Sequence, residues 1–276
     1  MPDQYAVIGH PVAHSKSPWI HGKFAQQLGQ DIRYSLLESA PENFHKTVFD
    51  FVHRGGSGLN VTLPFKKEAW AMANELSDHA KLAGAVNTLS FLADGSIRGD
   101  NTDGIGLVKD LTENQRLNLK GRKLLILGAG GAVRGVIRPL LEQCVERIHI
   151  ANRTVQKATE LAALFGQFGD VSAGSYEELG GEGGFDVIIN GTASSLSGDL
   201  PPVVSSVLAK GCHAYDMMYS AEKTVFEQWC AANGAASTSD GLGMLVEQAA
   251  ESFLIWRGIR PHTHDVLKEL SQQLTK

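Results

Sequence analysis

The stretch KLLILGAGGA, residues 123–132, decides the fold. A buried-type β-strand, Lys123 to Leu127, runs into a glycine-rich turn, and the segment after it has the apolar pattern of a helix. Glycines allow such a turn to bend tightly and to approach a pyrophosphate at the positive N-terminus of the helix. The spacing departs from G-x-G-x-x-G, because Val133 takes the sixth position. We predict a Rossmann-like dinucleotide site whose pyrophosphate-binding residues are Gly128, Ala129, Gly130, Gly131 and Ala132.

The end of the next predicted strand, residues 147–151, indicates which dinucleotide is bound. An acidic residue about 20 positions past the glycine turn would bind a ribose 2′-hydroxyl and indicate NAD. This chain instead has Asn152, Arg153 and Thr154, with Lys157 one turn later. A guanidinium and a second cation suit a 2′-phosphate, so we predict NADP (NADPH) as the cofactor. The alternative is that both cations are solvated residues at the start of a surface helix.

Strand-like and helix-like segments alternate on both sides of this stretch. Before it we predict strands at 5–9, 33–37 and 58–62, and helices at 17–28 and 42–52, with Ser17 as the N-cap of the first helix. Residues 86–91 and 96–99 read as an antiparallel hairpin. The predicted fold class is α/β, with an N-terminal α/β substrate domain that has a mostly parallel sheet and a Rossmann-like NADP-binding domain. We place the substrate domain at 1–103, completed by 241–276, and the NADP domain at 104–240.

Composition excludes several classes of protein. With 43% apolar and 20% charged residues, the chain can bury a core and is not a disordered tail. The net charge is −5 and no five like charges are consecutive, so we expect no nucleic-acid partner. We expect no signal peptide and no membrane span, because no apolar run approaches the roughly 20 residues that a span needs. Cys144, Cys212 and Cys230 are interpreted as buried, reduced thiols, which predicts a cytoplasmic protein.

Four polar motifs lie around the predicted strand ends of the N-terminal third. They supply hydroxyls, amides, the amine of Lys66 and the carboxylate of Asp103, and they span residues 14–18, 60–66, 84–88 and 99–104. The chain has no HExxH motif, no Cys-rich metal spacing and no G-x-S-x-G elbow. His262 and His264 lack a third ligand, so we expect no metal site. The pattern favours a small carboxylated and hydroxylated ligand whose proton is handled by a Lys–Asp pair.

With two later motifs, Asp216-Met217-Met218-Tyr219 and residues 240–249 (DGLGMLVEQA), the set resembles the shikimate dehydrogenase family over nearly the whole chain. The resemblance implies an NADP-dependent oxidoreductase that reduces 3-dehydroshikimate to shikimate in chorismate and aromatic amino acid biosynthesis. It implies that Lys66 and Asp103 are the catalytic pair. Hydride transfer to a ketone leaves an alkoxide, so a nearby acid must supply a proton.

The resemblance also implies a role for each remaining motif residue. Ser15 and Ser17 would hold the substrate carboxylate. The ring hydroxyls would be bound by Asn60, Thr62, Asn87 and Gln248, with Tyr219 closing one side. The adenosine ribose phosphate would be bound by Asn152, Arg153, Thr154 and Lys157, and the nicotinamide would be flanked by Met217 and Gly241. Asp78 matches a position sometimes assigned to the cofactor, but we find no physical role for it.

Other interpretations stay open at this stage. A quinate/shikimate dehydrogenase paralogue would use either nicotinamide cofactor, although Asn152 and Arg153 argue against NAD. A methylenetetrahydrofolate dehydrogenase also has a catalytic lysine, but paired serines do not suit a pteridine. A non-catalytic, NADP-responsive binding module belongs to a different class, and the Lys66 and Asp103 pair weighs against it. Taken singly, Lys66 could be a solvated residue and Asp103 a helix cap. The chain could be a monomer or a homodimer.

Overall fold

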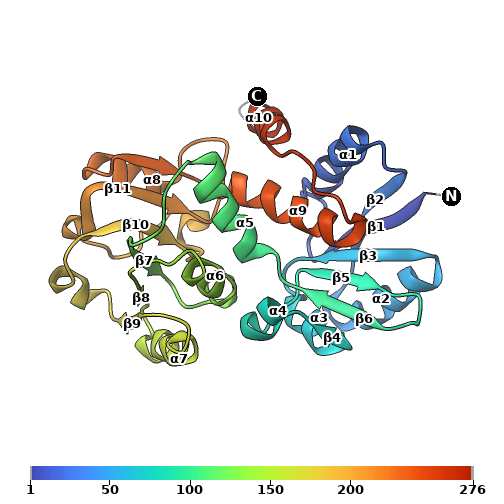
Figure 1. The fold of residues 1–276 in the computed structure, drawn as a ribbon, viewed down its shortest axis with the longest axis horizontal. Coiled ribbons are helices and arrows are strands. Elements are labelled where there is room, and N and C mark those ends of the chain that lie inside the picture. Colours follow the sequence, from blue (N-terminus) through green and yellow to red (C-terminus); the bar gives the residue numbers. More distant parts are fainter. Residues whose placement is uncertain (1, 275–276) are drawn as a thin grey trace. The chain divides into compact units, whose positions relative to one another are not determined.

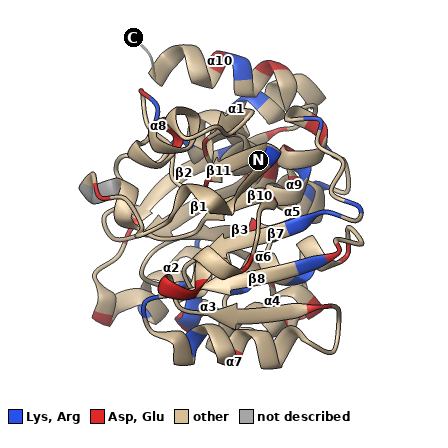
Figure 2. Cartoon of the chain, turned by 90° about the vertical axis from the view of Figure 1, so that its left-hand side faces the viewer, with Lys and Arg blue, Asp and Glu red and all other residues tan. Residues whose placement is uncertain are grey.

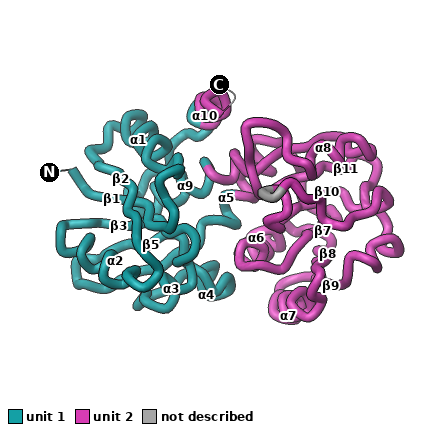
Figure 3. The backbone as a smooth tube through the Cα atoms, turned by 180° about the vertical axis from the view of Figure 1, so that it is seen from behind, with its two compact units in different colours: residues 1–106, 246–266 teal, residues 107–245, 267–276 magenta. Residues whose placement is uncertain are grey.

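A computed structural model describes residues 2–274, except for the side chains of residues 196 and 197. The chain forms two compact units, shown in Figures 1 and 3. Unit 1 contains residues 1–106 and 246–266, and unit 2 contains residues 107–245 and 267–276. Residues 246–266, near the C-terminus, thus return to unit 1, whereas most of the final helix belongs to unit 2.

Unit 1 is built on a mixed β-sheet. Its strands are β1 (Asp3–Gly9), β2 (Ile32–Glu38), β3 (Gly56–Val61), β4 (Glu75–Leu76), β5 (Thr88–Phe91) and β6 (Ile97–Asp100). The six strands described here pair in the order β2-β1-β3-β5-β6-β4. β1 is parallel to β2 and β3, and β4 is parallel to β6, but β5 is antiparallel to both of its neighbours. The sheet is therefore rich in parallel pairs, as expected, and the predicted antiparallel hairpin forms around Gly95 (φ 86°), where the chain reverses between β5 and β6. The antiparallel pairing of β5 with β3 was not predicted.

Two helices of unit 1 follow the predicted segments 17–28 and 42–52 closely, with one correction, whereas the helices at 66–72 and 78–83 were not predicted. The helices of unit 1 are α1 (Ser17–Leu28), α2 (Phe44–His53), α3 (Lys66–Met72), α4 (Asp78–Ala83) and the start of α5 (Asp103–Lys109), together with most of α9 (Leu242–Arg257) and the start of α10 (His264–Leu274). Gly29 ends α1 in the left-handed conformation, as predicted. Ser17 is not the N-cap, since helical geometry already begins at Lys16 and the Ser17 N–H donates to Ser15 Oγ at 3.3 Å.

The core of unit 1 lies between the sheet and helices α2 and α3. Phe44 and Phe65 are almost fully buried and stack with ring centroids 4.7 Å apart. Val48 of α2 and Leu59 of β3 belong to the same buried cluster. Buried aromatic rings of this size dominate core stability. Since Phe65 directly precedes Lys66, this packing also holds the first residue of α3 in place.

Unit 2 has the parallel sheet that residues 123–132 predict. Its strands are β7 (Lys123–Leu127), β8 (Arg147–Ala151), β9 (Val171–Gly174), β10 (Phe185–Asn190), β11 (Leu208–Asp216) and β12 (Ser237–Ser239). Within the described residues these strands pair in parallel, in the order β12-β11-β10-β7-β8-β9. The helices between the strands are α6 (Gly131–Leu141), α7 (Val155–Phe165) and α8 (Val225–Ala232). β7 and α6 flank the glycine turn, as in a Rossmann-like unit.

The surface features agree with the composition, apart from one cysteine. Acidic and basic residues are interspersed along elements such as α10, which carries Asp265, Lys268 and Glu269 (Figure 2). Of the three free thiols, Cys212 and Cys230 are buried, but Cys144 is exposed, contrary to expectation, because it lies in the turn between α6 and β8. Among residues 2–274, no helix combines the length and apolarity that crossing a bilayer requires.

Candidate active site

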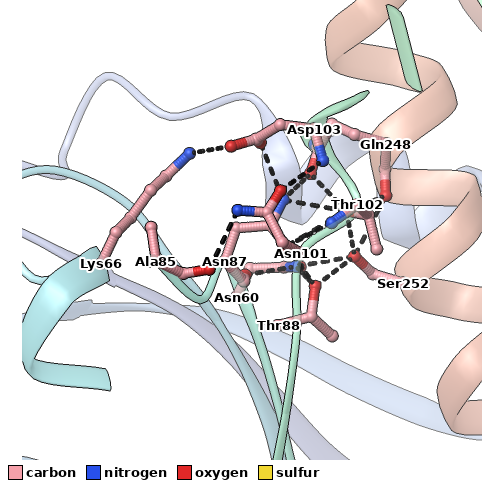
Figure 4. A network of polar contacts seen from close by, with 10 residues as sticks. All are labelled: Asn60, Lys66, Ala85, Asn87, Thr88, Asn101, Thr102, Asp103, Gln248 and Ser252. Atoms are coloured by element: carbon pink, nitrogen blue, oxygen red, sulfur yellow. Dashed lines mark hydrogen bonds and ion pairs between the residues drawn. The ribbon is translucent and has the colours of Figure 1, made fainter. Parts of the chain in front are cut away.

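An ion pair between Lys66 and Asp103 is the centre of the polar cluster in unit 1 (Figure 4). Lys66 Nζ donates to Asp103 Oδ2 at 2.6 Å, and the two side chains are 27% and 12% exposed. Each group stands on the first residue of a helix, α3 or α5, where the chain leaves the sheet. The N-terminus of α5 favours a carboxylate at Asp103. The pair is therefore partly shielded from water while the ammonium keeps some access to solvent.

Asn87 fixes the orientation of the Asp103 carboxylate. The Thr102 backbone N–H can only donate, and it points at Asn87 Oδ1 at 2.9 Å. The amide nitrogen of Asn87 must therefore face the other way, where it donates to Asp103 Oδ1 at 2.8 Å. Each carboxylate oxygen of Asp103 thus has its own donor, one from Asn87 and one from Lys66. Such a fully paired carboxylate is held in one orientation.

Asn60 and Gln248 join the same network from other elements. Asn60, on β3, donates to the Asn87 backbone carbonyl at 3.2 Å and accepts from the Tyr34 hydroxyl at 2.7 Å. Gln248, on α9, accepts from Asn87 Nδ2 through Oε1 at 3.3 Å. Thr62 follows β3, and its backbone N–H donates to Ile8 at 2.9 Å. One network thus joins Lys66 to four other predicted residues of unit 1, namely Asp103, Asn87, Asn60 and Gln248.

Ser15 and Ser17 form a second polar group in unit 1. Their hydroxyls lie 3.2 Å apart, and Ser17 is buried while Ser15 is half-buried. A hydrogen bond with Ser17 lowers the pKa of Tyr34, but burial raises it more, so the pKa of this phenol lies well above 10. The Tyr34 hydroxyl therefore contacts Ser17 as well as Asn60 and links the two groups of predicted binding residues.

His21 is a buried titratable group behind these residues. Its ring is 0% exposed and stacks on Tyr34 with centroids 4.2 Å apart and planes 7° apart. Burial lowers the pKa of His21 from 6.5 to about 3, and the Asn60 side chain offsets this only in part. The imidazole is therefore neutral at physiological pH. It acts as an aromatic support for Tyr34 rather than as a charge.

We expect His21 to make the protein less stable in acid. Because its pKa is lower in the folded than in the unfolded chain, the unfolded chain gains a proton first as the pH falls below about 6.5. This linkage should cost up to about 2 kcal/mol of unfolding free energy by pH 5. In a His21→Phe variant, denaturant titrations at pH 7 and pH 5 should show a smaller loss between the two pH values. An equal loss in both proteins would contradict the assignment.

The glycine turn of unit 2 has the geometry that a pyrophosphate requires. Gly128 has φ 103°, a backbone conformation that residues with a side chain rarely adopt. A Cβ at this position would lie 3.1 Å from Thr192 Cγ2. Gly130 is the N-cap of α6 without a side-chain hydrogen bond, and a Cβ on Gly130 or Gly131 would meet open space. Ala129 and Ala132 complete the turn. The start of α6 therefore presents backbone N–H groups on an accessible surface.

Cationic side chains follow the neighbouring strand β8. Arg153, Thr154 and Lys157 are exposed, and Asn152 Nδ2 donates to the Thr154 carbonyl at 2.8 Å. Thr154 is the N-cap of α7 and makes no side-chain cap hydrogen bond. Since β7 and β8 are adjacent and parallel, both loops leave the same edge of the sheet. The residues present thus fit a dinucleotide with a 2′-phosphate.

Three further predicted residues of unit 2, and Asp78 of unit 1, lie outside the polar network and the glycine turn. The three in unit 2 are Met217, Tyr219 and Gly241. A Cβ on Gly241 would lie 2.3 Å from the Met217 carbonyl oxygen, so only glycine allows these two segments to approach each other. Tyr219 is half-buried, and burial raises its pKa. Asp78 is exposed in the first turn of α4, where its carboxylate accepts from Lys81 at 3.3 Å. Among the described residues, no group of three or more His, Cys, Asp or Glu could hold a metal ion.

The structure adds residues that the sequence analysis did not assign to the site. All four residues hydrogen-bond directly to predicted ones: Tyr34, Thr88, Thr102 and Ser252. Thr102 lies within the polar motif at residues 99–104, next to Asp103, so its position in the sequence could have indicated a place in the site. Tyr34 and Ser252 lie in ordinary strand and helix patterns, which give no signal of a polar contact.

Family models match three segments of the chain. The model of the shikimate dehydrogenase substrate binding domain matches residues 7–89. The shikimate / quinate 5-dehydrogenase model matches residues 110–198, and the model of the shikimate 5′-dehydrogenase C-terminal domain matches residues 241–270. The first segment contains Lys66, Asn60 and Asn87, and the second contains the glycine turn.

Relatives match the chain from end to end. A protein of Hahella chejuensis named shikimate dehydrogenase (NADP(+)) is 54% identical over 270 residues, which cover 98% of this chain and 99% of the relative. The crystal structure of an Ael1 enzyme from Pseudomonas putida has a TM-score of 0.91 and 43% identity, covering 99% of this chain and 98% of that one. The structure of the Thermus thermophilus shikimate 5-dehydrogenase in complex with NADP(H) and shikimate has a TM-score of 0.86 and 31% identity, with 99% coverage of both chains.

Proposed function

Because the chain belongs to the shikimate dehydrogenase family, we propose that it catalyses the NADPH-dependent, reversible reduction of 3-dehydroshikimate to shikimate, a step of chorismate and aromatic amino acid biosynthesis. The observation that carries this proposal is the ion pair between Lys66 and Asp103, at 2.6 Å, within a network of amides and hydroxyls. Such a network suits a hydroxylated ring, and the amine supplies the proton that ketone reduction needs.

Lys66 is the proposed general acid. When the cofactor is bound it supplies the hydride, and Lys66 Nζ then donates a proton to the oxygen of the former ketone. Asp103 holds the ammonium in place by accepting its hydrogen bond at 2.6 Å. Asn87 keeps the carboxylate turned toward the lysine through its bond to Asp103 Oδ1. In the oxidative direction the same lysine, once deprotonated, accepts the proton of the substrate hydroxyl.

The substrate is proposed to bind in unit 1. Ser15 and Ser17 hold its carboxylate, since their hydroxyls lie together and one of them stands on the first residue of α1. The ring hydroxyls are bound by side chains of the network and its neighbours, namely Asn60, Thr62, Asn87 and Gln248. Tyr219 is proposed to close one side of the site. These side chains are uncharged hydrogen-bonding groups. They can orient the ring while the Lys66 ammonium stays paired with Asp103.

NADP is proposed to bind to unit 2. Residues 128–132 at the start of α6 would hold the pyrophosphate, since the backbone N–H groups are accessible there. Asn152, Arg153, Thr154 and Lys157 would bind the 2′-phosphate, and Met217 and Gly241 would flank the nicotinamide. Unit 1 is accordingly the substrate domain and unit 2 the NADP domain. A cytoplasmic location is proposed because Cys144, Cys212 and Cys230 are free thiols, which are usual in that compartment.

A spectrophotometric assay of the purified protein tests the proposal. Shikimate with NADP should give a rise in absorbance at 340 nm, and 3-dehydroshikimate should oxidise NADPH. Parallel assays with quinate and with NAD should give much lower kcat/KM. Comparable activity with quinate or NAD would instead indicate a quinate/shikimate paralogue. No turnover with any of the four pairs would refute the enzymatic proposal.

A further inference from the structure

Ser252 places a hydroxyl on a buried face of α9, one turn after Gln248. Its buried neighbours on the helix, Ala249, Ala250 and Phe253, are 0% exposed, and Ser252 itself is also 0% exposed. Serine in the middle of a helix commonly donates back to the carbonyl four residues earlier, and Ser252 Oγ does so to Gln248 at 3.0 Å. A buried hydroxyl on such a face needs further partners.

Those partners belong to the network around the proposed site (Figure 4). Ser252 Oγ lies 2.9 Å from Asn60 Nδ2, 2.8 Å from Thr88 Oγ1 and 3.3 Å from Thr102 Oγ1. It therefore joins the helix that carries Gln248 to strands β3 and β5 of the sheet. Thr88 in turn donates to Asn87 Oδ1 at 2.9 Å. Within the described part of the chain, the hydrogen bonds of Ser252 reach neither Lys66 nor Asp103.

The donors and acceptors around Asn60 show what Ser252 contributes. The Asn87 backbone carbonyl can only accept, so the atom of Asn60 that faces it must be Nδ2. This nitrogen has two hydrogens and three oxygens within reach. Ser252 Oγ is the nearest at 2.9 Å, whereas the Asn87 carbonyl and Thr88 Oγ1 both lie at 3.2 Å. Without the serine hydroxyl, Asn60 keeps two acceptors but turns toward the sheet.

We propose that Ser252 is a positioning residue for substrate recognition, acting through Asn60 and Gln248. The proposal rests on the proposed function, because those two side chains are the ones assigned to the ring hydroxyls. Ser252 sets the direction of the Asn60 amide, and it bonds to the backbone carbonyl of Gln248 in the turn of α9 from which Gln248 projects. It leaves the proton transfer to Lys66 and Asp103. Its removal therefore affects the binding of the ring much more than the chemical step.

A Ser252→Ala variant tests this division of roles. We expect the KM for shikimate to rise about fivefold, the effect of losing one neutral hydrogen bond. The kcat should change less than twofold, and the pH profile of kcat and the KM for NADP should be unchanged. Calorimetric titration of shikimate into the enzyme without cofactor, where no turnover occurs, should show the same loss of affinity. A second variant, Ser252→Cys, occupies the same position with a weak donor and should give an intermediate KM.

Ser90→Ala is the matched control. Ser90 also carries a buried hydroxyl on β5, but its Oγ has no hydrogen-bond partner among the described residues. Its removal should leave both the KM and the kcat unchanged. The proposal is overturned if Ser252→Ala keeps the wild-type KM, if its kcat falls while the KM does not rise, or if Ser90→Ala raises the KM equally. These outcomes presuppose an active wild-type enzyme, whereas a wild type without turnover refutes the proposed function itself.

Discussion

Replacement of Lys66 by alanine should lower turnover at least about 100-fold, the usual effect of removing a general acid. The Lys66 amine lies 2.6 Å from Asp103. Among the residues labelled in Figure 4 it is the only cationic side chain, so none of the others can replace it as a cationic proton donor. The KM for shikimate should change little, because the ring is held mainly by serine, threonine and amide side chains. Initial rates in both directions, at saturating cofactor, measure the two constants.

Lys67→Ala is the control for this variant. Lys67 is the next residue of α3 and is exposed, so its removal changes the charge of the protein equally without touching the network. Its turnover should match that of the wild type. A Lys66→Ala enzyme that keeps more than a tenth of wild-type turnover would remove Lys66 from the role of acid, and the lysine would then serve only to position substrate.

Reversal of charge at Arg153 should raise the KM for NADPH about 100-fold. Hydrogen bonds to charged groups contribute about 1.5–3 kcal/mol, and a carboxylate in Arg153→Glu would also repel a 2′-phosphate. Arg153 is exposed after β8, next to the N-terminus of α7, so the substitution should not disturb the core. Steady-state kinetics with NADPH at fixed 3-dehydroshikimate measure the effect.

NADH serves as the internal control for the same variant. It lacks the 2′-phosphate, so its KM should stay within about threefold of the wild-type value if Arg153 acts on that phosphate alone. An equal loss with both cofactors would show that the substitution damages the loop. A loss with neither cofactor would mean that Lys157 or another group binds the phosphate, and that Arg153 is a solvated surface residue.

The fold of unit 2 was predictable because its signals are local. The apolar strand at 123–127, the glycine turn and the following helix are neighbours in the sequence, and each has a periodic or conformational requirement of its own. Strands β4, β9 and β12 were not predicted. They have two to four residues, too few for an alternating pattern, and each lies at the edge of its sheet.

The sheet direction in unit 1 was less predictable. Alternating strands and helices indicate parallel strands, and β1, β2 and β3 do pair in this way. β5, however, enters the sheet antiparallel to β3, although helices α3 and α4 precede it. The direction of a strand after two short helices depends on how those helices pack against the sheet, and no sequence pattern specifies this.

The candidate site divides in the same way. The sequence predicted the lysine, the carboxylate and the amides through residue type and through the resemblance of the motifs to a known family, since ketone reduction and a hydroxylated ring suit those groups. Only the tertiary structure assigned the hydroxyl of Ser252 to Asn60, a residue 192 positions away in the sequence. It alone also placed His21 behind Tyr34 and fixed the Asn87 amide through the Thr102 N–H. The physical reason is that chemistry is carried by residue type, which the sequence displays, whereas the direction of a hydrogen bond depends on where distant backbone segments meet.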